Sequence, residues 1–356
     1  MFGSGVVIYF ILFGALLLIE KYKNMQQEID FVIFWVDDTD PAWREAFLAA
    51  RRESCPEDDA SLIRVRCWHN LHYWFRSVER FAPWVRRVHL VTWGHLPSWL
   101  VEQHPKLNIV LHTDFIPQQY LPTFNSLTIG LNLHRIEGLG EQFVVFNDDM
   151  FLTRECRPED FFRNGLPCDM ARLSIVQPSS IGHIIYNDLE LINAKWDKRK
   201  AMRRHWRKWM NPRYGLSNLL KTMTLLPWSV FPGMSDHHMP QPYLRSHCYR
   251  CWEEWGEALD TACRHRFRHL TNVSDYLFRY DMLAAGEFSP RNMNDCCLMT
   301  IKDSTIEHIA HDITTRRWRM ICINDSNDIS DFDSMRDRLN SAFDELLPAK
   351  STYEKQ

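Results

Sequence analysis

The sequence predicts an α/β fold, in which a doubly wound, mostly parallel sheet carries a helical insertion. Over residues 25–184, short runs of branched and aromatic residues alternate with segments of helical periodicity. Residues 185–285 are instead rich in Trp, Arg and His at helical spacing and are broken by prolines. Residues 286–347 return to a strand and a closing helix, which we expect to complete the α/β core. Strands that alternate with helices at this spacing form parallel sheets.

The elements of the first part follow from local composition. Strands are predicted where branched and aromatic residues run together, at residues 28–36, 88–92, 107–111 and 143–146. Helices are predicted where apolar residues recur at helical spacing, at residues 67–81 and 125–136. The first helix stops before Pro83, and the second begins at the capping pair Asn125-Ser126 and ends at glycines.

The remaining parts are less regular. Residues 185–285 are predicted to form a helical insertion or lid that leans over the sheet. Further along, residues 320–323 (MICI) predict a strand and residues 334–347 an amphipathic closing helix. The polar tail, residues 348–356, is predicted to fray.

The charge balance indicates no nucleic-acid partner. Lys and Arg nearly equal Asp and Glu, and the formal net charge is −3, so no global field attracts a polyanion. One basic stretch, residues 195–208 (KWDKRKAMRRHWRK), is interleaved with tryptophans. It is either a solvated helix face or a contact for phosphate, an anionic acceptor or a membrane surface.

The ten cysteines lack the spacing of a disulfide framework. This predicts mostly reduced thiols and a cytoplasmic location. His247-Cys248 and Cys251, with His237-His238 upstream, allow a zinc site, but no second CxxC pair completes it. Ordinary core cysteines are the other interpretation.

Residues 1–24 have two interpretations. Residues 1–19 are almost wholly apolar and just long enough for a membrane helix. Lys21 and Lys23 behind them would keep the rest of the chain on the cytoplasmic face of the membrane. Alternatively, Met25 is the real start and the leader is an upstream misreading.

Acidic and amide side chains follow three predicted strands, at residues 37–40, 147–149 and 324–325. In doubly wound sheets, ligands bind at the carboxyl ends of the strands, so the three groups could converge on one crevice. Each group alone is also compatible with a turn. Carboxylates without a Gly-rich phosphate loop suit Mg²⁺ or Mn²⁺ holding a diphosphate. General acid–base catalysis by Asp148 and Asp149 is the competing interpretation.

Two other stretches could serve phosphoryl transfer. Residues 235–240 contain His237 and His238, and a neutral imidazole is the usual base near pH 7. Arg266 and Arg268 could supply a cation to a migrating phosphate. Non-catalytic histidines and a solvated basic patch are the plain alternatives.

Several stretches, in order, resemble the Stealth family. They are IDFVIFWVDDTDPAW (29–43), the run from Asn70 to Arg86, LPTFNS (121–126), FVVFNDDMF (143–151), DHHMP (236–240), FRHLTNVSDYLF (267–278) and CINDSND (322–328). The resemblance therefore covers residues 29–347. Family members are bacterial capsular and exopolysaccharide hexose-1-phosphate transferases, and the eukaryotic GlcNAc-1-phosphotransferase of the mannose-6-phosphate pathway is a relative.

The resemblance implies a nucleotide-sugar-transferase-like fold and transfer of a sugar-1-phosphate from a UDP-sugar to a hydroxyl of a glycan acceptor, with release of UMP. It implies His238 as the base, Arg268 as the phosphate clamp and Asp149 as a third catalytic residue. The implied metal ligands are Asp148, Asp149 and Asp325. The implied substrate contacts are Trp35, Asp37, Asp40, Arg76, Asn125 and Asn147.

The sequence departs from the family pattern at three places. Asp38 stands where the family usually has glycine, and His72 replaces a common arginine. The doubled His237-His238 leaves open which imidazole is the base, although the spacing to Pro240 favours His238.

Two other functions stay open on the sequence alone. A metal-dependent glycosyltransferase on a similar fold would release UDP instead of UMP. An inactive, membrane-tethered glycan-binding subunit would use the fourteen tryptophans to stack on sugars.

Overall fold

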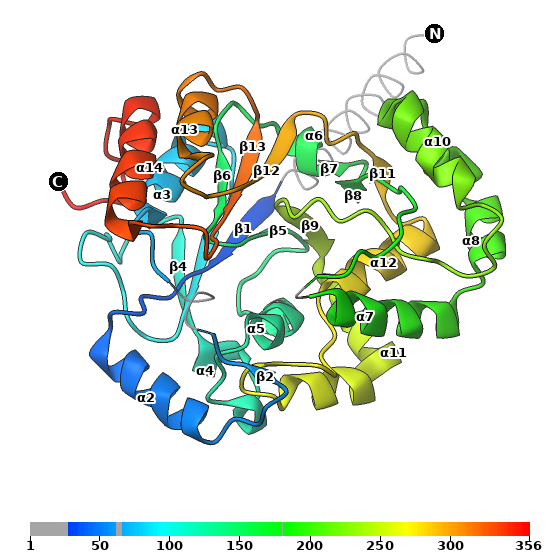
Figure 1. Cartoon of the computed structure of the whole chain (residues 1–356), viewed down its shortest axis with the longest axis horizontal. Helices are drawn as coiled ribbons and strands as arrows, with labels where there is room; N and C mark the ends of the chain where they lie inside the picture. Colours follow the sequence, from blue (N-terminus) through cyan, green and yellow to red (C-terminus); the bar gives the residue numbers. More distant parts are fainter. Residues whose placement is uncertain (1–27, 62–65, 180) are drawn as a thin grey trace, which may run out of the picture.

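The computed structural model describes residues 28–61, 66–179 and 181–356. Its centre is a sheet of order β4–β3–β1–β5–β9 (Figure 1). The strands are β1 (Ile29–Phe34), β3 (Val88–Thr92), β4 (Leu107–Leu111), β5 (Gln142–Phe146) and β9 (Gln241–Leu244). The first four are parallel, and β9 pairs antiparallel with β5. The predicted α/β fold with a mostly parallel sheet is confirmed.

Strand β1 shows why these runs are continuously apolar. Phe31 and Ile33 pack with α3 (Leu71–Phe81) in one buried cluster. Val32 packs on the other side, in the cluster that contains α5 (Ser126–Asn132) and α12 (Tyr276–Ala285). A parallel strand buried on both faces has no polar face to alternate with.

The last part of the chain forms its own small sheet. It pairs β12 (Cys296–Thr300) in parallel with β13 (Met320–Asn324), and β13 antiparallel with β6 (Met150–Leu152). The strand predicted at residues 320–323 therefore exists but lies outside the central sheet. Helices α13 (Ile306–Thr314) and α14 (Phe332–Leu346) pack with it.

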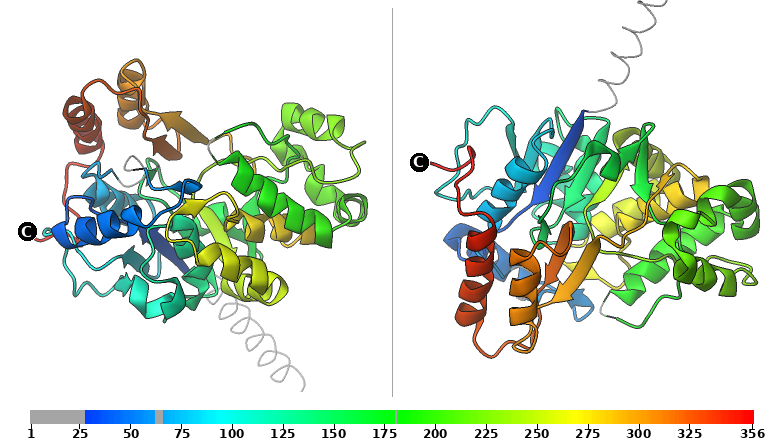
Figure 2. Two further views of the ribbon diagram at one scale, coloured as in Figure 1. Left: turned by 60° about the horizontal axis from the view of Figure 1, so that its bottom comes forward. Right: turned by 90° about the horizontal axis from the view of Figure 1, so that it is seen from above.

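The predicted helical insertion is mainly helical. Its helices are α7 (Gly182–Lys195), α8 (Lys198–Arg204), α9 (Trp206–Trp209), α10 (Leu216–Thr224), α11 (Arg245–Cys263) and α12. Figure 2 shows α7–α10 on one side of the molecule and α13–α14 on the other. However, β9 lies within this part and extends the central sheet, with Pro242 on an edge strand, where a missing N–H is tolerated. The segment therefore contributes a strand to the central sheet as well as helices.

The prediction that residues 348–356 fray is wrong. Ser351, Tyr353 and Glu354 are almost fully buried, and Arg76 Nε and Nη2 donate hydrogen bonds of 2.8 Å each to the two carboxylate oxygens of Glu354. Burial and pairing over a long sequence separation tie down a tail whose composition alone suggested disorder.

The remaining α-helices and β-strands complete the fold. They are α2 (Pro41–Arg52), β2 (Asp58–Asp59), α4 (His112–Phe115), α6 (Pro158–Phe161), β7 (Phe162–Arg163), β8 (Leu166–Asp169), β10 (Arg268–His269) and β11 (Ser289–Pro290). All ten cysteines are free thiols. None of the helices in the described ranges is long and apolar enough to span a membrane. The segment considered as a membrane helix, residues 1–19, lies outside those ranges.

Candidate active site

A cavity of about 620 Å³ opens where three strands end. Trp35 and Val36 follow β1, residues 147–149 follow β5, and residues 324–325 close β13, and all of these line the cavity. The ends of β1, β5 and β13 therefore converge on one crevice, as the sequence predicted, although β13 belongs to a different sheet and residues 37–40, the polar group after β1, are not among the residues that line the cavity. The carboxyl ends of strands are the usual ligand-binding edge of such folds.

Asp149 and His238 meet in this cavity. His238 Nε2 lies 3.8 Å from Asp149 Oδ2, and Nδ1 lies 3.4 Å from the Tyr276 hydroxyl. The other carboxylate oxygen of Asp149 is buried and has no hydrogen-bond partner among the described residues. His238 has a φ of 48°, a left-handed conformation that costs free energy in a residue with a side chain. An unsatisfied carboxylate oxygen beside a histidine with a strained backbone is typical of a functional site.

The charges of the site shift two pKa values. Burial disfavours the imidazolium of His238, but the hydrogen bond and charge of Asp149 outweigh it, so the pKa of His238 is raised. The side chain of Asp148 is accessible from the cavity, but many protein atoms lie around it and limit its contact with bulk water. Burial and the adjacent charge of Asp149 raise the pKa of Asp148 to about 7.

The two neighbouring histidines lie in different environments. His238 lines the cavity, whereas His237 does not. Burial and the nearby Arg279 lower the pKa of His237 to about 3, so this imidazole stays neutral. The geometry therefore favours His238 over His237 as the group that meets a substrate.

Arg279 anchors the segment that carries the histidines. Its guanidinium is buried and donates to both carboxylate oxygens of Asp169, at 2.7 and 2.9 Å. A further N–H donates to Asp236 at 2.8 Å, which also accepts from the Tyr280 hydroxyl. These bonds hold the backbone directly before His238.

Arg268 lies on a two-stranded ribbon at another wall of the cavity. In this ribbon, β10 pairs antiparallel with β2, and Arg268 stands opposite Asp59; both residues line the cavity. Arg268 Nη2 donates to Ser126 Oγ at 2.9 Å. Asn125 holds the same segment in place, because its side-chain amide donates a hydrogen bond to Phe267 O at 3.0 Å. Asn125 itself does not line the cavity and caps α5, so the structure gives it a positioning role.

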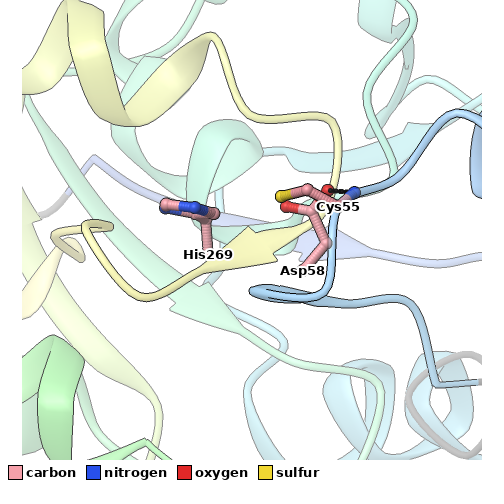
Figure 3. A group of neighbouring side chains, drawn as sticks. All are labelled: Cys55, Asp58 and His269. Carbon is pink, nitrogen blue, oxygen red and sulfur yellow. Dashed lines mark hydrogen bonds between the residues drawn. The ribbon is translucent and has the colours of Figure 1, made fainter.

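The next pair of the ribbon forms a separate group. His269 stands opposite Asp58, and with Cys55 they bring three donor atoms within 4.8 Å of one another (Figure 3). None of the three lines the cavity. The ribbon thus presents Arg268 and Asp59 to the cavity and this group elsewhere.

Three predicted substrate contacts have other partners. Asp40 caps α2 by accepting from Trp43 N at 2.8 Å. Asp37 Oδ1 accepts from the backbone and hydroxyl of Thr39. Arg76 is paired with Glu354. None of these three predicted contacts is among the residues that line the cavity.

Asp37 nevertheless lies near the cavity. Burial raises the pKa of the cavity-lining Cys67 thiol to about 12, and the charges of Asp148, Asp37 and Asp38 add to this effect. These carboxylates at the ends of β1 and β5 are therefore close enough to act on one thiol.

Asp325, a predicted metal ligand, is occupied by a cation of the chain itself. Arg66 donates to both of its oxygens, with Nε at 2.7 Å, and Trp68 Nε1 donates at 3.2 Å. Because its acceptors are taken by this pairing, Asp325 is available to a metal only if Arg66 moves away.

Sequence reasoning missed Cys322, which meets Asp149 and His238 with all three donor atoms within 4.8 Å. Burial and the charge of Asp149 raise the pKa of the Cys322 thiol well above its ordinary value, so it stays protonated. A protonated thiol is a poor ligand. The usable donors of this group are one carboxylate, which suits Mg²⁺ or Mn²⁺, and one imidazole, which suits zinc, so this group alone does not select between these ions.

The alternative zinc site resolves into a buried polar network. His247 and Cys251 meet Asp281, but His247 Nε2 is 3.0 Å from Phe278 O, and Lys195 Nζ is 3.1 Å from Asp281 Oδ1. Chain groups already satisfy these donors and acceptors.

Comparison with known proteins identifies the family. Residues 64–168 match the family model for conserved region 2 of Stealth proteins. The capsular polysaccharide phosphotransferase WcwK of Streptococcus pneumoniae is 37% identical over 337 residues, which cover 94% of this chain and 100% of the relative. The chain belongs to the Stealth family. Within this Stealth protein, the matched region contains Asp148 and Asp149 of the cavity.

Two further relatives of this Stealth protein match over nearly their whole lengths. The exopolysaccharide phosphotransferase cps2G of Lactiplantibacillus plantarum is 37% identical over 334 residues (92% of this chain, 96% of the relative). The receptor polysaccharide phosphotransferase WefC of Streptococcus oralis is 34% identical over 332 residues (92% and 99%). The solved structure of mouse xyloside xylosyltransferase 1, apo form, aligns with a TM-score of 0.33 at 10% identity (83% of this chain and 97% of that chain).

Proposed function

We propose that this Stealth protein is a sugar-1-phosphate transferase of capsular or exopolysaccharide synthesis. It would move a hexose-1-phosphate, for example GlcNAc-1-phosphate, from a UDP-sugar to a hydroxyl of a glycan acceptor. The names of its relatives, which are polysaccharide phosphotransferases, support this class of reaction. The observation that carries the proposal is the contact between Asp149 and His238 in a cavity that Arg268 also lines.

The proposed reaction needs three tasks from the chain. The acceptor hydroxyl oxygen attacks the β-phosphorus, the bond from that phosphorus to the bridging oxygen breaks, and UMP leaves. The hydroxyl proton passes to His238, and Asp149 stabilises the imidazolium that forms. The guanidinium of Arg268 stabilises the charge on the migrating phosphate oxygens.

A divalent cation completes the proposal. Asp149, with its unpartnered oxygen, and the adjacent Asp148 would hold Mg²⁺ or Mn²⁺. The ion would screen the charge of the diphosphate. Excess EDTA should abolish turnover, and added Mg²⁺ or Mn²⁺ should restore it. Full turnover in EDTA would show that the reaction needs no metal ion.

The walls of the cavity suit the donor. Trp35, Trp43, Trp93 and Phe124 line it, and aromatic faces stack on bases and sugars. The volume falls within the usual range for small-molecule sites, about 300–1,000 Å³. Asn147, at the end of β5, adds an amide that can hydrogen-bond the donor.

The reaction is placed in the cytoplasm in this proposal. All ten cysteines are free, including those near the surface, which suits a reducing compartment.

The leaving nucleotide tests the proposal. The purified protein is incubated with a panel of UDP-sugars, Mg²⁺ and a glycan acceptor, and the released nucleotide is identified by mass. Release of UMP is the expected result, since the bond between the two phosphates breaks. Release of UDP would make the protein a glycosyltransferase, and release of neither would favour a binding subunit.

A further inference from the structure

The segment 198–235 has an extreme charge composition. It contains nine Lys and Arg residues and no Asp or Glu, in a chain whose net charge is −3. The segment builds α8, α9, α10 and the loop that follows. None of its residues lines the cavity, so the proposed reaction does not explain this charge.

Most of these cations face solvent. Seven are exposed, and none of them forms an ion pair with any residue in the described ranges: Arg199, Lys200, Arg203, Arg204, Arg207, Arg213 and Lys221. The other two turn inward. Lys198 Nζ donates to Leu225 O and Trp228 O, at 2.7 Å each, which fastens α8 to the loop after α10.

Helix α10 is apolar on its exposed side. Leu216, Leu220 and Met223, at positions i, i+4 and i+7, are 73%, 50% and 49% exposed, so they form one stripe. The other side of the helix packs on the core through Leu219 and the buried Thr222. A helix that is apolar on both sides has one face without a partner.

The loop after α10 extends this stripe. Trp228 and Val230 are each 48% exposed. Of the twelve large apolar side chains exposed in the described ranges, six lie between residues 206 and 230. Half of the exposed apolar side chains are thus concentrated beside the unpaired cations. Figure 1 shows α8 and α10 side by side at the rim of the molecule.

We propose that this surface, formed by α8–α10 and residues 225–230, docks on an anionic lipid bilayer. Exposed Leu, Met and Trp side chains enter the boundary between headgroups and acyl chains, and Lys and Arg contact the anionic headgroups. A nucleic acid or an acidic polysaccharide would match the charge but would leave the apolar stripe in water. The inference does not depend on the proposed reaction.

The test is hydrogen–deuterium exchange of the full chain with vesicles. Vesicles of equal parts phosphatidylglycerol and phosphatidylcholine should protect the amides of residues 216–230, and phosphatidylcholine vesicles should protect them far less. This readout is local, so binding through any other part of the chain does not imitate it. High salt should weaken the protection, because it screens the headgroup contacts.

Two double variants separate the contributions. Leu220→Ser/Met223→Ser removes apolar area, and Arg203→Glu/Arg204→Glu reverses two charges. Each double variant should raise the lipid concentration that gives half-maximal protection at least about tenfold. Leu48→Ser, which changes an exposed apolar side chain of α2, is the matched control and should leave the protection unchanged. Circular dichroism checks that each variant folds.

Three results would overturn the proposal. They are no protection of residues 216–230 with anionic vesicles, equal protection in both double variants, or equal protection of these residues by a single-stranded DNA oligonucleotide of matched charge concentration.

Discussion

Two charged pairs of this molecule differ in almost every respect. Asp149 and His238 are 3.8 Å apart, with one carboxylate oxygen unsatisfied. Arg76 and Glu354 form two hydrogen bonds of 2.8 Å, and Glu354 also accepts from Ser351. The first pair lines a cavity, whereas the second fastens the C-terminal tail.

The difference separates function from stability. In the second pair every acceptor has a hydrogen-bond partner, so the pair contributes to the stability of the folded protein. In the first pair a polar atom is buried without a partner, and the chain holds His238 in a strained conformation. Such costs persist where a substrate or ion supplies the missing contacts. Asp149, His238 and Arg76 all belong to blocks that resemble the Stealth family, and only geometry distinguishes their roles.

The largest effect is expected from Asp149→Asn. Turnover should fall by about a hundredfold or more, because the imidazolium and the cation both lose a charge partner. The unfolding free energy should change by less than about 1 kcal/mol, since the carboxylate has an unpartnered oxygen. Steady-state UMP formation and urea unfolding measure the two quantities. A stable variant with normal turnover would contradict the proposed role of Asp149.

Arg76→Ala should show the reverse pattern. Removing one partner of a buried pair should lower the unfolding free energy by about 3 kcal/mol, while folded protein keeps its rate of UMP formation. Glu53→Gln, which breaks the exposed pair with Arg266, is the matched control and should cost less than about 1 kcal/mol. Loss of turnover in folded Arg76→Ala would instead indicate that Arg76 contacts the substrate.

A smaller effect is expected from Arg268→Lys. The charge remains, but a point charge does not reproduce a two-pronged contact with phosphate, so turnover should fall about tenfold. An unchanged rate in Arg268→Lys would show that Arg268 acts only as a distant charge.

The smallest effect concerns the titration of His238. Asp149 raises the pKa of this imidazole, so the pKa should fall in Asp149→Asn, as measured by NMR with His238→Gln for assignment. A raised pKa means that His238 stays protonated to higher pH. The wild-type rate should therefore decline as pH decreases through that value, and any stability from the pair should be lost as pH rises through it. An unchanged pKa in the variant would show that the 3.8 Å contact carries no energy.

Four strands of the central sheet, β1, β3, β4 and β5, could be predicted because each is a run of mostly branched and aromatic apolar residues. The strand ends could be predicted as a site for the same reason: residues 147–149 interrupt such a run with carboxylates. The crevice formed by the ends of β1, β5 and β13 follows from this reasoning.

The rest depends on contacts between distant positions. Strand β9 contains Pro242 in a helix-rich part, and only its pairing with β5 makes it a strand. Arg66 and Asp325 are separated by 259 positions, and nothing near Asp325 in the sequence shows that its acceptors are taken. Cys322 reaches Asp149 through the pairing of β13 with β6, which no local pattern predicts.

The role of His238 as the base is tested most directly by the rate of UMP formation by His238→Ala and by the wild-type protein, with a UDP-sugar, a glycan acceptor and Mg²⁺. We expect a rate at least about a hundredfold lower in the variant, with an unfolding curve close to that of the wild type. An unchanged rate in a folded His238→Ala protein would contradict this role.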